Sequence, residues 1–218
     1  MRFTERLIGL KNWTIENLCK GREMKAPAPN QDIGVIQRQE PTCYLAWAPA
    51  RMDRTGNIRE IPASTVPGIL IMPNQTYARY MEEKRFDRYN NIHRPQDMGQ
   101  HLSVSILFSV YEPGVRLPGF VANIDDQGQG FDQALLLEGT EQGLFTLMNW
   151  MDDCMQKLLG QKMIRGTDLF VQDETLTYGL YTDQQYVVDR RPIYYGFVNV
   201  IFECHANEEY NPEIERLL

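Results

Sequence analysis

The segment DRRPIYYGFVNVIFECHAN, residues 189–207, predicts the strand around which this fold is built. Successive residues of a strand point to opposite faces of the sheet, so the segment divides into two sets. The cleaner apolar set is Tyr194, Val198, Val200, Phe202 and Cys204, with Gly196 allowing a close approach. The mixed set is Ile193, Tyr195, Phe197 and Ile201, interrupted by Asn199 and Glu203. We expect the cleaner set to pack on a helix, and the mixed set to be covered by a neighbouring subunit or by the chain's own insertions.

A helix suited to the cleaner set is predicted over residues 143–159. Its Leu and Met residues recur every three or four positions, as on the buried face of an amphipathic helix, and Gly160 follows as a stop signal. The apolar positions are Leu144, Leu147, Met148, Met151, Met155, Leu158 and Leu159. Asp152 and Asp153 fall opposite, where adjacent helical side chains diverge. We interpret them as a polar face rather than an acid and base couple.

Short apolar or alternating runs predict the other strands. HLSVSILFSVY, residues 101–111, is the clearest, because Leu102, Val104, Ile106, Phe108 and Val110 alternate with Ser103, Ser105 and Ser109. Further candidates are residues 42–47, residues 66–72 closed by Pro73, residues 167–172 and residues 175–181, with a hairpin turn favoured at Thr55-Gly56-Asn57. Polar turns rather than helices separate most of these runs, which indicates antiparallel pairing.

At the N-terminus, residues 3–20 predict a second amphipathic helix ended by Gly21. Its apolar stripe is Phe3, Leu7, Leu10, Thr14 and Leu18. MKAPAPNQDIG, residues 24–34, is rich in Pro, Ala and polar residues and is interpreted as a connection. Residues 74–96 fit either a helix or an ordered loop, and that choice stays open.

The predicted fold class is therefore α+β: a mainly antiparallel β-sheet packed against an N-terminal helix and a second amphipathic helix, with long loop insertions. A chain of 218 residues is long enough for one substantial core. We expect a single domain over residues 1–218, with insertions near residues 74–100 and 112–140 and a short C-terminal extension, residues 205–218.

Composition limits the classes of partner. The formal charge of −7 argues against a protein that gains affinity by neutralising phosphates. The four cysteines, Cys19, Cys43, Cys154 and Cys204, lie far apart without a CxxC pair, so we predict free packing residues in a reducing compartment. The longest strongly apolar run, residues 68–72, is far too short to cross a bilayer. We expect no membrane association. We expect the protein to be made in a cytoplasm.

No catalytic signature is present among the common motifs: the sequence has no G-x-S-x-G, no G-x-x-x-x-G-K-[ST] and no H-E-x-x-H. Cys204 and His205 are neighbours on a predicted strand and point apart, which disfavours a thiol and base pair. His93 and His101 could form a metal pair only if the chain folded back, and surface or hydrogen-bonded histidines are the better interpretation. We predict no catalytic residue, no metal and no cofactor.

Two clusters suggest binding surfaces. Tyr77, Tyr80 and Tyr89 lie near Arg85 and Arg88, and Tyr and Arg are the residues that protein interfaces concentrate, so interface and internal packing stay equally open. Met148, Met151, Met155 and Met163 fit core packing better than an adaptable groove.

The order of these elements resembles the tail terminator (tail completion) proteins of long-tailed bacteriophages and of related phage-tail-like particles. The resemblance is carried by the N-terminal helix, the strands VPGILIMP and HLSVSILFSVYEPG, the Leu and Met helix, and the final RRPIYYGFVNVIFE. The resemblance covers most of the chain and rests on the order of the elements and on these sequence segments.

The resemblance implies a structural virion protein rather than an enzyme. It implies a hexameric ring at the head-proximal end of the tail tube, which stops tube growth and offers a surface to the neck. The implied partners are further copies of the chain, the tail tube protein, a neck or head-tail connector protein and, as a further candidate, the sheath, with DNA only in passage through the lumen. The implied location is the neck region of the virion tail, after assembly in the host bacterial cytoplasm.

Subunit or tube contacts are then expected at Tyr77, Tyr80, Arg85, Arg88, Tyr89, Tyr195 and Phe197. Asp125 and Asp126 lie in a long Gly and Pro loop, and we expect them to face the lumen, where like charge would keep DNA from binding as it passes. The alternatives are another neck, connector or baseplate component, a small-molecule enzyme with a site built from the long loops, and a monomeric binding module.

Overall fold

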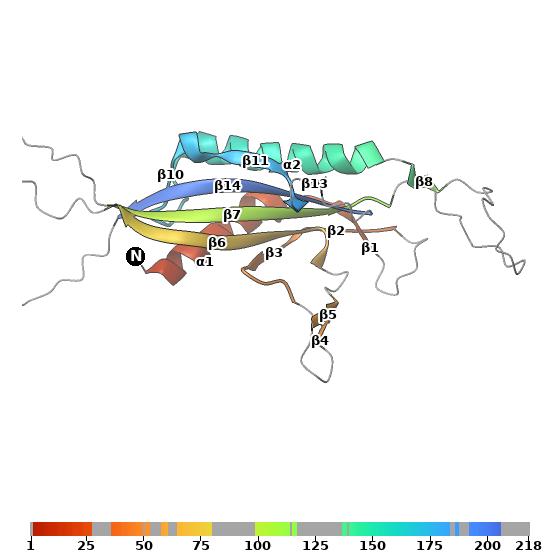
Figure 1. Ribbon diagram of the computed structural model, residues 1–218, viewed down its shortest axis with the longest axis horizontal. Coiled ribbons are helices and arrows are strands. Elements are labelled where there is room, and N and C mark those ends of the chain that lie inside the picture. The colour runs from red at the N-terminus through yellow and green to blue at the C-terminus, as the bar shows by residue number, and fades with distance from the viewer. Residues whose placement is uncertain are drawn as a thin grey trace, which may run out of the picture.

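Three long antiparallel strands form the centre of the protein, whose computed structural model is an α+β fold (Figure 1). They are β6 (Gly68–Arg79), β7 (Gly99–Tyr111) and β14 (Ile193–His205). β14 pairs with β7 over its whole length, from Ile193 opposite Tyr111 to His205 opposite Gly99. The structure describes residues 2–27, 36–49, 51–52, 58–60, 65–79, 99–113, 115–116, 137–138, 140–183, 186–187 and 192–205.

Three short strands complete this sheet: β3 (Thr42–Leu45), β10 (Phe170–Val171) and β11 (Thr177–Leu180). The strand order is β10-β14-β7-β6-β3, and β11 also pairs with β14. Every pairing in it is antiparallel except that of β3 with β6, which is parallel. The predicted class, a mainly antiparallel sheet with an N-terminal helix, is confirmed.

Smaller elements lie around the main sheet. The paired short strands are β1 (Met24–Pro27) with β2 (Ile36–Gln39), β4 (Arg51–Met52) with β5 (Ile58–Glu60), β8 (Val115–Arg116) with β9 (Leu137–Glu138), and β12 (Thr182–Asp183) with β13 (Tyr186–Val187). The β4–β5 pair brackets the predicted turn at residues 55–57, and the turn itself lies outside the described residues. A 3₁₀ turn, η4 (Asp173–Thr175), precedes β11.

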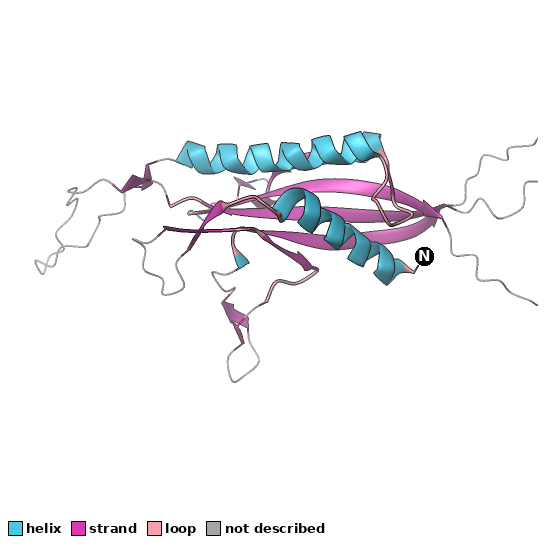
Figure 2. Cartoon of the chain, turned by 180° about the vertical axis from the view of Figure 1, so that it is seen from behind, coloured by secondary structure: helices cyan, strands magenta, loops and turns pink. Residues whose placement is uncertain are grey.

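Both described α-helices, α1 (Phe3–Thr14) and α2 (Thr140–Gln161), pack on one face of the sheet. Figure 2 shows α1 in front of the long strands. A π-helical turn, η1 (Ile15–Cys19), continues α1. Two indoles join these segments: Trp13 Nε1–H donates to Gln161 Oε1 at 2.6 Å, and Trp150 Nε1–H donates to the Leu18 carbonyl at 3.0 Å. The helix predicted over residues 143–159 and the strand predicted over residues 101–111 are confirmed.

The predicted end of the β6 strand at Pro73 is wrong, because β6 continues to Arg79. Pro73 lies opposite Val104, and the register then shifts before Thr76 pairs with Leu102. Such an irregularity accommodates a proline, which cannot donate to the ladder. The open choice between helix and loop for residues 74–96 is thereby replaced by a strand for residues 74–79, and the remainder lies outside the described residues.

The interpretation of residues 24–34 as a plain connection is also wrong at its beginning, because Met24–Pro27 forms β1. Met24 and Ala26 are buried, whereas the Lys25 ammonium lies 2.5 Å from Glu112 Oε1. This alternation was hidden by Pro27 and the polar residues that follow. Pairing with β2 and the core overrides the weak local preference for a strand.

The buried face of α1 differs from the predicted stripe. Leu10, Thr14 and Leu18 are buried as expected, but Phe3 is 39% exposed. Arg6 and Trp13 are buried instead. The prediction failed because it considered only apolar residues. It therefore ignored Arg6, whose charge is paired inside the protein.

Candidate assembly surface

The two faces of β14 separate as its alternation predicts. Val198, Val200, Phe202 and Cys204 are buried in the core that α2 covers, and Tyr194 packs against it. Gly196 lies directly beneath α2, because a Cβ atom there would lie 2.6 Å from the Sδ atom of Met151. The expectation that this set faces the stripe of Leu147, Met151 and Leu158 is confirmed.

The opposite side of the three long strands carries neither described helix, and we call it the open face. Its residues are Leu70, Met72 and Asn74 of β6, Ser103, Ser105, Leu107 and Ser109 of β7, and Tyr195, Phe197, Asn199 and Ile201 of β14. All eleven side chains are half-buried or exposed and uncharged, and the half-buried Glu203, two positions after Ile201 on β14, continues the same face with a carboxylate. A surface designed only for water would carry charged residues.

Register arranges the open face in rows. Leu107 lies opposite Leu70 on one side and Phe197 on the other, which forms an apolar row across β6, β7 and β14. Directly opposite residues in antiparallel strands are close enough for their side chains to touch. The next row along holds Ser105 between Met72 and Asn199.

Polar side chains on the open face bond to one another. The Asn74 amide donates to Ser105 Oγ at 2.8 Å, and the Ser105 hydroxyl donates to Asn199 Oδ1 at 2.6 Å. The Ser109 hydroxyl donates to the Gly68 carbonyl at 3.1 Å. Because these groups already have protein partners, covering them with another surface costs less than covering free polar groups.

The structure places two of the predicted contact residues on this face: Tyr195 and Phe197 are half-buried on β14. Tyr77 belongs to β6, at the register position opposite His101. Tyr80, Arg85, Arg88 and Tyr89 lie outside the described residues, as do Asp125 and Asp126. Sequence reasoning missed Leu107. A leucine within the series Ser103, Ser105 and Ser109 could have indicated an apolar position on this face.

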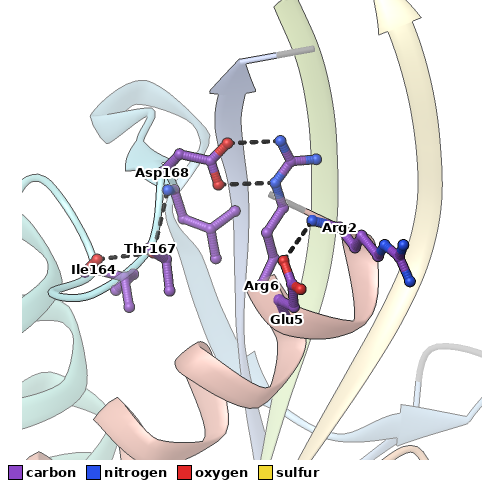
Figure 3. A network of polar contacts seen from close by, with 7 residues as sticks. Arg2, Glu5, Arg6, Ile164, Thr167 and Asp168 are labelled. Atoms are coloured by element: carbon purple, nitrogen blue, oxygen red, sulfur yellow. Dashed lines mark hydrogen bonds and ion pairs between the residues drawn. The ribbon is translucent and has the colours of Figure 1, made fainter. Parts of the chain in front are cut away.

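A buried ion pair fastens α1 to the loop between α2 and β10 (Figure 3). Arg6 Nε donates to Asp168 Oδ1 at 2.8 Å, and Nη2 donates to Oδ2 at 2.6 Å. The Arg6 side chain is only 3% exposed. A Cβ atom on Gly9 would lie 2.2 Å from Thr167 Cγ2, so α1 approaches this loop closely. The pair is structural and explains how an arginine can lie in the core.

Arg6 also sets the titration of Asp168. The hydrogen bonds from Arg6 lower the pKa of the Asp168 carboxyl below its ordinary value of 3.8. Since the native pKa lies below the unfolded one, this pair stabilises the native state fully above pH 3.8, and the contribution is lost as pH falls through the native pKa. We expect the difference in unfolding free energy between wild type and Asp168→Asn to shrink toward zero on acidification, measured by urea titration at several pH values. A difference that grows toward acid pH would contradict this assignment.

All four cysteines are free and buried, as predicted. Burial raises the pKa of Cys19 to about 11 and that of Cys43 to about 12, and it also raises the pKa values of Cys154 and Cys204. We expect negligible labelling by a thiol reagent at pH 8 in the native protein and labelling of all four thiols in denaturant. Rapid labelling of native protein would show that this core opens readily.

Among the described residues, the other sequence candidates form no reactive cluster. His101 is buried on β7, whereas His93 lies outside the described residues. Of the methionines singled out, Met151 is buried, Met148 and Met155 pack against the core, and Met163 is 42% exposed. Within the described ranges, no group of three or more His, Cys, Asp or Glu side chains could hold a metal ion.

Among the described residues, no helix combines the length and apolar character needed to cross a membrane. No protein-family model matches this chain, and no curated protein matches it either.

Proposed function

We propose that this chain is a structural virion protein that caps the head-proximal end of a phage tail tube as a ring, ends tube polymerisation and provides the surface that joins the neck. The observation that carries the proposal is the one-sided sheet: α1 and α2 cover one face, and the open face is half-exposed and mostly apolar or neutral, with Glu203 at its end. Such a face suits burial against another protein, as a subunit of an assembly requires.

Two further observations support an assembling protein. The order of helices and strands agrees with the layout from which the resemblance to tail terminators was drawn. Trp47, just after edge strand β3, is 84% exposed, and exposed tryptophan is a frequent anchor of protein contacts. In this role the chain needs no catalytic group, metal or cofactor. Its partners are its own copies, the tail tube protein and a neck or connector protein.

The test combines the purified chain with preformed tubes of a phage tail tube protein. We expect closed rings by negative-stain electron microscopy, rings on one end only of each tube, and tubes that stop growing when free tube protein is added. Binding along the tube wall, or continued growth from both ends, would contradict the capping role. Gene neighbours for tube, sheath or tape measure would support it independently.

A further inference from the structure

We draw no further inference here: the strongest candidate, the open face of β6, β7 and β14 with its apolar row of Leu70, Leu107 and Phe197, carries nothing beyond the proposed function, because nothing in the structure shows what covers it.

Discussion

Replacing Asp168 by Ala is expected to lower the free energy of unfolding by about 3–5 kcal/mol, because it leaves the Arg6 charge inside the protein without its carboxylate. Arg6 is buried and bonds Asp168 through two nitrogens, whereas Asp168 itself is 20% exposed. That partial exposure places the expected loss at the lower end of the range. Urea unfolding at neutral pH measures it.

Two variants sharpen the interpretation of that loss. Glu16→Ala breaks the exposed Glu16–Lys20 pair and should change stability far less, since both side chains are more than half exposed. Arg6→Met combined with Asp168→Leu removes both charges and should recover most of the loss. An Asp168→Ala variant as stable as wild type would show that this pair does not hold α1 in place.

Replacing Trp150 by Ala is expected to cost about 3–5 kcal/mol, through the cavity left where the indole is removed. Trp150 is fully buried and packs edge-on against Phe108 of β7, with ring centroids 5.1 Å apart. Its N–H also bonds the buried Leu18 carbonyl, so the substitution deprives η1 of a partner. Because native proteins are stable by only about 5–15 kcal/mol, Trp150→Ala would remove a large share.

Trp150→Phe is the matched control for the packing contribution. It keeps an aromatic ring near Phe108 but loses the donor to Leu18, so a smaller cost of about 1–3 kcal/mol is expected. Thermal and urea unfolding measure both variants. If Trp150→Ala and Trp150→Phe cost the same, the hydrogen bond rather than packing holds this junction.

Local pattern was enough to predict the elements that carry strong periodicity. The Leu and Met repeat of α2 and the alternation in β7 and β14 each recur at spacings set by backbone geometry alone, and each was placed correctly. Gly196 was also expected at a close approach, and Met151 lies there. Weak or interrupted patterns failed, as at Pro73 within β6 and at Met24 in β1, because pairing partners decided those strands.

The candidate surface was predictable only in part. Tyr195 and Phe197 were assigned to a face that a neighbouring subunit or the chain's own insertions would cover, and the structure puts them on the helix-free side of β14. The sequence alone could not show that Tyr195 and Phe197 share a face with Leu107 and Leu70. The apolar row of Leu70, Leu107 and Phe197 depends on the register of two strand pairings. Register is set by the hydrophobic pattern of all three strands together with their turns.

By itself, the sequence determined that DRRPIYYGFVNVIFECHAN has one clean apolar side and one mixed side, since alternation is a property of neighbouring residues. Only the tertiary structure decided what meets each side. It brought Ser105 to Asn199 across 94 positions and Arg6 to Asp168 across 162, which turned isolated polar residues into bonded groups. Contacts between residues so far apart in the chain leave no periodic trace in the sequence. They exist only because β7 pairs with β14 and α1 packs against the loop after α2.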